Sequence, residues 1–127
     1  MVPETQRWSV DRSHELYNLG GWAAPYFGID ASGHLEVSPD GPDGPCTRLT
    51  TVVDMARRQG MSLPLLVRFD GILGHRVNTL AGVFRQAIDE TGFGGRYRPV
   101  YPIKVNQQRH VVEELIAAGR EAGLGLE

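Results

Sequence analysis

The apolar residues in the second half of the chain follow two alternating spacings. A continuous apolar run at residues 63–69 is typical of a strand that is buried on both faces. Spacings of three and four over residues 70–91 predict a helix with one apolar stripe. The same two patterns then recur, and they predict a strand at 97–105, a helix at 107–118 and the beginning of a third strand at 124–127.

Strands that alternate with helices predict a parallel sheet with right-handed crossovers. Such a sheet is covered on both faces, and two strands with the beginning of a third cannot complete one. We therefore expect a fragment of a longer α/β protein. The alternative is a small, complete two-layer domain.

The first half of the chain has an irregular pattern. Two apolar runs on either side of Ala31-Ser32-Gly33 predict a β-hairpin. The prolines and glycines of residues 38–45 exclude regular structure there. The spacing of Leu49, Val52, Val53 and Ala56 predicts a short helix over 49–59.

Residues that cap helices mark the ends of these predicted elements. Ser9 or Asp11 suits the N-cap of a short helix near Trp8, and Gly60 suits the C-terminal cap of the helix at 49–59. We expect an N-terminal segment at 1–60, with the hairpin and short helix, and strand–helix units at 61–127.

Composition and charge exclude several classes of partner. Apolar residues make up 41% of the chain and charged residues 22%, as in ordinary soluble proteins. With a net charge of -2 there is no electrostatic reason to expect nucleic acid or an anionic membrane. No apolar run approaches the ~20 residues that cross a bilayer, and residues 1–10 lack the apolar core of a signal peptide. We expect a cytoplasmic protein.

The sequence offers little for metal, phosphate or thiol chemistry. Cys46 lies in a turn-like stretch and is expected to be a plain loop cysteine rather than a nucleophile. The loop at 92–96 follows a helix and precedes a strand, so no helix N-terminus points at a phosphate there. The four histidines show no metal-ligand spacing, and we expect no metal site within the chain. They are His14, His34, His75 and His110.

Lys104 is the residue whose side chain is the clearest candidate for catalytic chemistry. It lies between Ile103 and Val105, inside the second predicted strand. Burial disfavours a charged amine, and a buried lysine is therefore a good nucleophile for a Schiff base. In a barrel of parallel strands, catalytic groups lie at the carboxyl ends of the strands, as Lys104 would. The alternative is a strand-end lysine whose amine reaches solvent.

Residues 100–107, Val-Tyr-Pro-Ile-Lys-Val-Asn-Gln, resemble the cofactor-lysine segment of the biosynthetic arginine decarboxylase family. Residues 63–76 resemble the first barrel strand and helix of that family, and residues 26–40 resemble its N-terminal segment. Residues 123–127 resemble the start of its third strand, so the resemblance extends from about Trp8 to the last residue.

The resemblance implies a fold and a reaction. The fold is a (β/α)₈ TIM barrel of the alanine-racemase type, incomplete in this chain, with a separate β domain. The reaction is the conversion of L-arginine to agmatine and CO₂ in polyamine and spermidine biosynthesis, by a pyridoxal-phosphate-dependent carboxy-lyase. Magnesium is also expected for the family, and the full-length protein is expected to be a homo-oligomer. The fragment alone is expected to be inactive.

The resemblance also implies roles for Lys104 and Glu127, and the two-residue period of a strand suggests one for Asn106. Lys104 would hold pyridoxal 5'-phosphate as a Schiff base, and the pyridinium ring would take up the electrons when the Cα–carboxylate bond breaks. Asn106 would share a strand face with Lys104 and touch the cofactor, or else cap the following helix. Glu127 lies where the family has an acid at the end of the third strand, and it would pair with Lys104. Tyr101 and Arg68 are expected to be packing and strand-end residues.

Two other functions stay open. One is another fold-related pyridoxal-phosphate enzyme, such as a diaminopimelate or ornithine decarboxylase or a racemase. The other is a non-catalytic module that binds pyridoxal phosphate. The residue order at 101–107 and the long segment before residue 61 favour the arginine enzyme.

Overall fold

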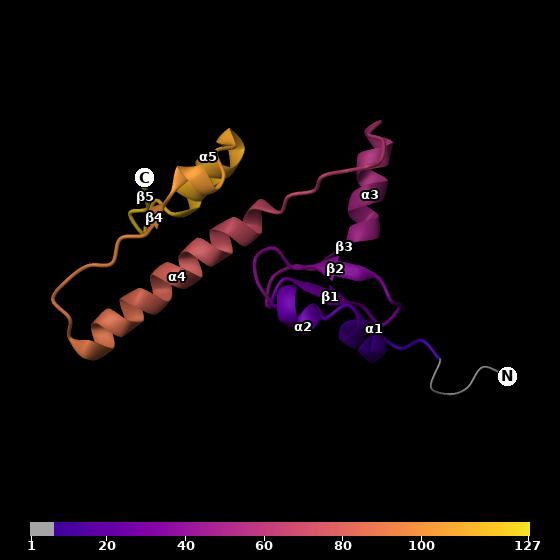
Figure 1. Cartoon of the computed structure of the whole chain (residues 1–127), viewed down its shortest axis with the longest axis horizontal. Helices are drawn as coiled ribbons and strands as arrows, with labels where there is room; N and C mark the ends of the chain where they lie inside the picture. Colours follow the sequence, from indigo (N-terminus) through magenta and orange to yellow (C-terminus); the bar gives the residue numbers. More distant parts are fainter. Residues whose placement is uncertain (1–6) are drawn as a thin grey trace. The chain divides into compact units, whose positions relative to one another are not determined.

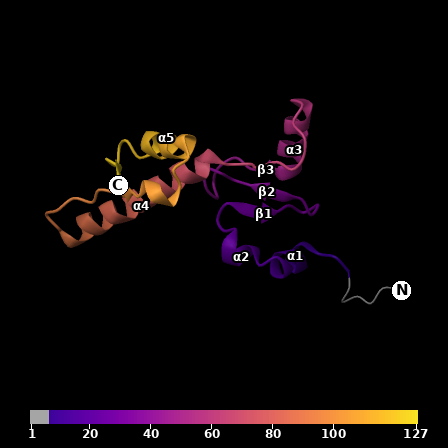
Figure 2. The ribbon, with the colours of Figure 1, turned by 45° about the horizontal axis from the view of Figure 1, so that its top comes forward.

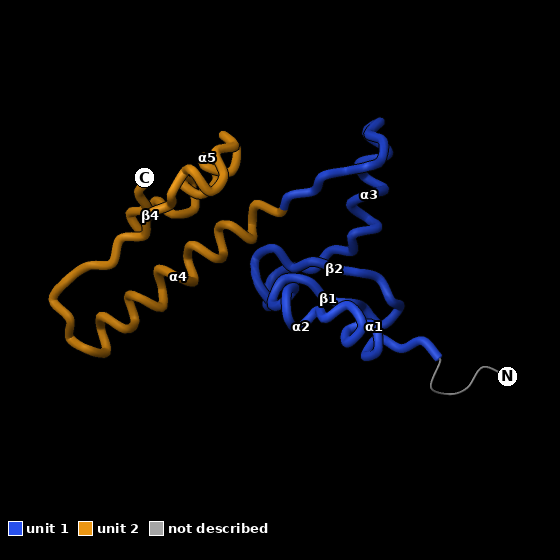
Figure 3. Tube along the Cα trace, viewed as in Figure 1, with its two compact units in different colours: residues 1–68 blue, residues 69–127 orange. Residues whose placement is uncertain are grey.

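The computed structural model describes residues 7–127. These form two compact units, and the boundary between them along the chain lies between Arg68 and Phe69 (Figure 3). Unit 1 is the part up to Arg68, and unit 2 runs from Phe69 to Glu127. Each unit has its own secondary structure and its own buried residues, so each is described separately.

Unit 1 is a small three-stranded antiparallel sheet with short helices (Figure 1). The sheet has the order β1-β2-β3, and Phe27 is paired with Val37 in its register. Its core consists of Leu19, Ala23, Tyr26 and Val37, none more than 9% exposed. Its elements are α1 (Val10–Leu16), α2 (Leu19–Trp22), β1 (Phe27–Ile29), β2 (Leu35–Val37), β3 (Thr47–Arg48) and α3 (Leu49–Arg58).

The predicted hairpin is confirmed, and the side chain of Asp30 fixes its turn. One carboxylate oxygen of Asp30 accepts hydrogen bonds from the backbone N–H groups of Ser32 at 2.8 Å and His34 at 3.0 Å. Gly33 takes a positive φ of 86°, which glycine tolerates best. The other carboxylate oxygen pairs with Arg48. Arg48 belongs to β3, a strand that the sequence did not predict because only two of its residues pair.

Unit 2 is built from α4 (Asp70–Thr91), β4 (Val100–Tyr101), a 3₁₀ turn at Ile103–Val105, α5 (Arg109–Ala118) and β5 (Gly125–Leu126). In both Figure 1 and Figure 2, α5 lies beside α4. A Cβ placed on Gly74 of α4 would meet the Cβ of Ala118 at 3.5 Å, so the two helices approach closely where α4 has no side chain. Buried residues come from both helices, and they are Ala81, Val111 and Leu115.

Several predicted helix ends are confirmed. The hydroxyl of Ser9 accepts a hydrogen bond from the N–H of Arg12 at 3.2 Å and caps α1. Gly92 ends α4 and Gly60 follows α3, both with positive φ. The parallel relation of the two strands in unit 2 is confirmed as well, because β4 pairs with β5 in parallel.

One predicted strand is wrong, and another is shorter than predicted. Residues 63–69 form no ladder, although their chain is apolar. A strand needs a partner for its backbone groups, and the apolar pattern does not reveal whether one is present. The strand predicted at 97–105 is reduced to Val100–Tyr101. Beyond Tyr101 the chain turns into the 3₁₀ segment, in which the N–H of Val105 donates to the carbonyl of Pro102.

The hairpin turn predicts an acid-sensitive unit 1. The backbone N–H of His34 is the main cause that holds the pKa of Asp30 below its ordinary 3.8, and the N–H of Ser32 and the charge of Arg48 act in the same direction against burial. The unfolded chain therefore takes up this proton first as the pH falls. The stabilisation is present above pH 3.8 and is lost as the pH falls through the lower pKa of the folded state.

We expect Asp30→Asn to remove this part of the pH dependence. The free energy of unfolding of unit 1, measured by urea titration at a series of acidic pH values, should fall less steeply in Asp30→Asn than in the unchanged chain. Asp43→Asn, at an exposed loop position, is the matched control and should keep the original slope. Equal slopes for the unchanged chain and Asp30→Asn would contradict the assignment.

Candidate functional site

The carboxyl ends of β4 and β5 meet at one edge of the parallel pair. The N–H of Gly125 donates to the carbonyl of Pro99 at 2.9 Å, and the N–H of Glu127 donates to the carbonyl of Tyr101 at 3.1 Å. The N–H of Ile103 then donates to the carbonyl of Glu127 at 2.9 Å. The backbone pairing therefore extends past both strands and ties Glu127 to the residue next to Lys104.

Lys104 lies in the middle of the 3₁₀ turn and is exposed. The N–H of Val105 donates to the carbonyl of Pro102 at 3.1 Å and closes this turn. The expectation of a buried lysine inside a strand is wrong for this chain, because β4 ends at Tyr101 and Lys104 is exposed in the turn that follows. Within residues 7–127 the amine has no hydrogen bond or ion pair, and this includes the predicted pairing with Glu127.

Lys104 is also the only lysine among the 13 lysine and arginine residues of the chain. Arginine stays protonated at all physiological pH values and forms no Schiff base with an aldehyde. Apart from the α-amine of the first residue, Lys104 is thus the only amine of the chain that can. The composition carries this signal, and the pattern of predicted strands does not reveal it.

Asn106 lies beyond the turn and is fixed by two hydrogen bonds. Its side-chain oxygen accepts from the N–H of Gln108 at 3.0 Å, and its carbonyl accepts from the hydroxyl of Tyr101 at 3.3 Å. Because the chain between Lys104 and Asn106 is not a strand, the expected shared strand face is absent. Gln108 occupies the N-cap position of α5, so Asn106 supports the start of the helix from two residues earlier.

The turn after α5 sets the path of the chain back to β5. The N–H of Leu124 donates to the carbonyl of Gly119 at 3.0 Å, and Gly123 takes a positive φ of 69°. A Cβ on Gly119 would lie 2.5 Å from the Cβ of Leu124 and 3.0 Å from the carbonyl of Leu115. Gly119 therefore allows the close approach that directs β5 alongside β4.

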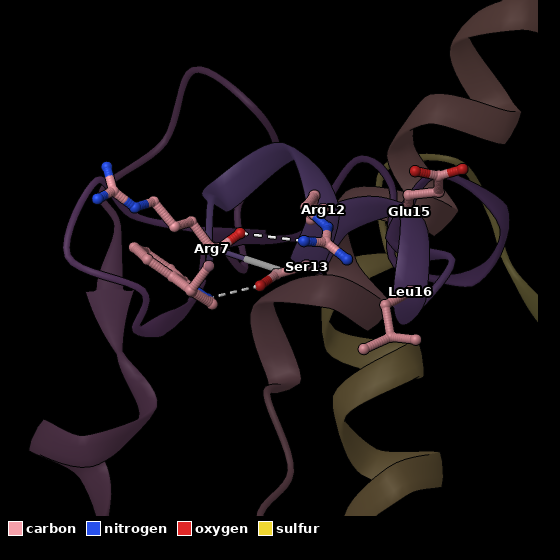
Figure 4. A pocket seen from close by; sticks show the side chains of 6 residues that line it. Arg7, Arg12, Ser13, Glu15 and Leu16 are labelled. Carbon is pink, nitrogen blue, oxygen red and sulfur yellow. Dashed lines mark hydrogen bonds between the residues drawn. The ribbon is translucent and has the colours of Figure 1, made fainter. Parts of the chain in front are cut away.

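A hollow of about 480 Å³ in unit 1 lies apart from these residues in the sequence (Figure 4). Its polar groups largely satisfy one another. The indole N–H of Trp8 donates to the hydroxyl of Ser13 at 2.9 Å, and the guanidinium of Arg12 donates to the carbonyl of Arg7 at 3.1 Å. With Glu15 and Leu16 as its remaining lining, the hollow includes none of the predicted site residues.

Metal and phosphate sites find little support in the described part of the chain. Across residues 7–127, no three His, Cys, Asp or Glu side chains gather where they could hold a metal ion. The loop at 92–96 follows the C-terminal end of α4, and the ring of Phe93 occupies the space beside Gly95. None of the helices described by the structure is long and apolar enough to cross a membrane.

Comparison with known proteins shows similarity over nearly the whole chain. The biosynthetic arginine decarboxylase of Prochlorococcus marinus (strain MIT 9313) is 44% identical over 126 residues, which are 99% of this chain and 19% of that protein. The biosynthetic arginine decarboxylase of Phocaeicola vulgatus is 44% identical over 122 residues, 96% of this chain and 19% of that protein. No family model matches the chain.

A solved structure agrees with these sequences. The crystal structure of the biosynthetic arginine decarboxylase from Campylobacter jejuni has a TM-score of 0.76 and 28% identity, over 87% of this chain and 18% of that protein. The predicted resemblance to biosynthetic arginine decarboxylases is therefore confirmed. The chain spans about a fifth of the length of the curated relatives that it matches.

The close approach at Gly119 predicts a strong effect of one methyl group. Gly119→Ala should lower the free energy of unfolding of unit 2 by about 1–3 kcal/mol, because the new Cβ collides with the Cβ of Leu124 and a backbone carbonyl. Gly82→Ala is the matched control, since nothing lies within 4 Å of its Cβ and it lies inside α4. It should stabilise the helix by up to about 1 kcal/mol. Chemical unfolding followed by circular dichroism measures both, and equal effects would refute the packing argument.

Proposed function

We propose that this chain is the cofactor-lysine segment of a biosynthetic arginine decarboxylase, which converts L-arginine to agmatine and CO₂ for polyamine synthesis. The observation that supports it most is the similarity to arginine decarboxylases at 44% identity over 99% of the chain. The single lysine of the chain, at the carboxyl edge of two parallel strands, is consistent with this function.

We also propose that β4, α5 and β5 form part of a (β/α)₈ barrel. Two parallel strands joined by a helix are the repeating unit of such a barrel. Unit 2 contains one such unit, and α4 precedes it as the helix of another. The division of the chain into a segment at 1–60 and barrel units at 61–127 stays a prediction.

Lys104 is the residue that we propose to hold pyridoxal phosphate. Its amine is exposed and unpaired within the described residues, so it is accessible to an aldehyde. The cofactor supplies a pyridinium ring that accepts the electron pair of the breaking Cα–carboxylate bond. The amine of Lys104 would condense with the aldehyde with loss of water, and after the substrate's amine displaces it, the free amine could deliver a proton to Cα.

The other residues of the edge would position this amine. The carbonyl of Glu127 fixes the backbone at Ile103, one residue before Lys104. We propose that the carboxylate of Glu127 approaches the amine when the cofactor is bound and stabilises its protonated form. Asn106 is proposed as a weaker contact to the cofactor, because its side-chain oxygen already accepts a hydrogen bond from the N–H of Gln108. The described residues offer no ligand set for magnesium, and no step is assigned to it.

A chimeric enzyme tests the proposal. The chain replaces the matching 126 residues of the Prochlorococcus marinus relative, and agmatine formation from arginine is measured. We expect activity with arginine above that with ornithine or diaminopimelate. Lys104→Arg, which keeps the charge but forms no Schiff base, should lower kcat by at least about a thousandfold. Activity that survives Lys104→Arg would sink the assignment of this residue.

A second amine provides the control for selectivity. Arg109→Lys introduces an amine at a position whose side chain is 88% exposed. Reduction with borohydride in the presence of pyridoxal phosphate, followed by peptide mapping, should label Lys104 in the chimera at least about tenfold more than the introduced amine, because only Lys104 lies at the proposed site. Equal labelling would indicate ordinary surface reactivity.

A further inference from the structure

We propose that Tyr101 is a positioning residue, whose hydroxyl fixes the turn that presents Lys104. This inference rests on the proposed function of Lys104 as the cofactor lysine. The sequence had indicated only a packing role for Tyr101. The structure places its hydroxyl on the carbonyl of Asn106 at 3.3 Å, so that the side chain spans the turn from one end to the other.

Tyr101 is anchored to the parallel pair by its backbone. It belongs to β4, and its carbonyl accepts the N–H of Glu127 at 3.1 Å. The residue is half-buried, so its ring has limited freedom. Because the ring is anchored at β4, its hydroxyl fixes the carbonyl of Asn106, at the far end of the turn, relative to the paired strands.

Asn106 accepts this hydrogen bond and is also bonded to the residue before α5. Its side-chain oxygen accepts the N–H of Gln108 at 3.0 Å, immediately before α5 begins. The carbonyl of Asn106 is thus tied to β4 and its side chain to the start of the helix. Within the turn, the hydrogen bond from Val105 to Pro102 sets the local backbone.

Lys104 lies between these anchors. The backbone before it is bonded to Glu127 through Ile103, and the backbone after it is bonded to Tyr101 through Asn106. With the backbone held on both sides, the amine moves only through rotation about the bonds of its own side chain. A catalytic group is effective only when its supporting residues hold it in place, and an exposed lysine on an unrestrained loop would lack that support.

The phenol itself is not assigned to the reaction. Its proton is directed to the carbonyl of Asn106, so it acts on Lys104 only through the backbone of the turn. At 3.3 Å the hydrogen bond is longer than the usual 2.5–3.0 Å of an O–H···O contact. We therefore expect a modest effect on the order of the turn rather than loss of the fold.

The test uses the full chain with Tyr101→Phe, which removes only the hydroxyl. Tyr97→Phe is the matched control, because that ring stacks on Phe84 with centroids 3.9 Å apart. Amide hydrogen exchange at Val105 and Gln108 should be about three- to tenfold faster in Tyr101→Phe, which corresponds to one weak hydrogen bond. Both amides should exchange at the original rate in Tyr97→Phe, as should the amides inside α4 and α5 in Tyr101→Phe.

A second readout reports the orientation of the bound aldehyde. Pyridoxal phosphate is added to the chimeric enzyme, with and without Tyr101→Phe, and the Schiff-base absorbance and its induced circular dichroism are recorded together. In Tyr101→Phe the absorbance per chain should stay unchanged, while the induced signal per bound aldehyde should fall to about half or less. A residue that only stabilises the fold would lower the melting temperature without this selective loss.

The outcomes separate this inference from the proposed function. Unchanged exchange at Val105 and Gln108 in Tyr101→Phe overturns the positioning role, and so does faster exchange throughout unit 2. An unchanged induced signal overturns it too. If the chimeric enzyme shows no Schiff-base band with pyridoxal phosphate, or if its agmatine formation survives Lys104→Arg, the proposed function fails, while the exchange measurements still decide whether Tyr101 orders the turn.

Discussion

The parallel main-chain pairing of β4 with β5 is the interaction on which the candidate site depends. Parallel strands cannot be joined by a tight turn, so a helix must connect them, and α5 does so here. The glycines after α5 allow the chain to return close to the helix before β5 begins. Once the strands pair, their carboxyl ends coincide, and the turn with Lys104 and the backbone of Glu127 lie at the same edge.

The unit that contains this edge buries few apolar side chains among the residues that the structure describes. Its buried residues are small or of medium size, whereas Val100, Val105 and Leu126 around the parallel pair are 53%, 70% and 43% exposed. Full burial of a valine or leucine side chain contributes roughly 1.5–3 kcal/mol. In the proposed decarboxylase, further strands and helices would supply that burial. The site would then be more rigid in the whole enzyme than in this chain.

Local signals allowed most of the helices to be predicted from the sequence. The hydroxyl of Ser9 and the glycines at 60 and 92 act on backbone groups within a few residues of themselves, and such effects are visible in a short window. The hairpin was predictable for the same reason, because Asp30 bonds to amides only two and four residues away. The spacing of apolar residues was sufficient for α3, α4 and α5.

The strands and the site depended on distant partners, and there the sequence was less informative. Residues 63–69 have the composition of a buried strand, but composition cannot supply the neighbouring strand that would make them one. The 3₁₀ turn that leaves Lys104 exposed follows a ladder whose other strand is more than 20 residues away along the chain, and a short window of sequence does not show that pairing. The octapeptide at residues 100–107 indicated the resemblance to biosynthetic arginine decarboxylases, since that inference needs only the order of residues.

The exposure of Lys104 separates two requirements of the proposed chemistry. An amine must be presented at a fixed position, and it must lose its proton before it attacks an aldehyde. The first requirement can be met within this chain, through the ladder and the hydrogen bonds around the turn. The second is commonly met by burial, which this chain does not provide for Lys104. Positioning of the lysine is therefore a property of these residues, whereas its activation in the proposed enzyme has to come from the polypeptide that encloses them.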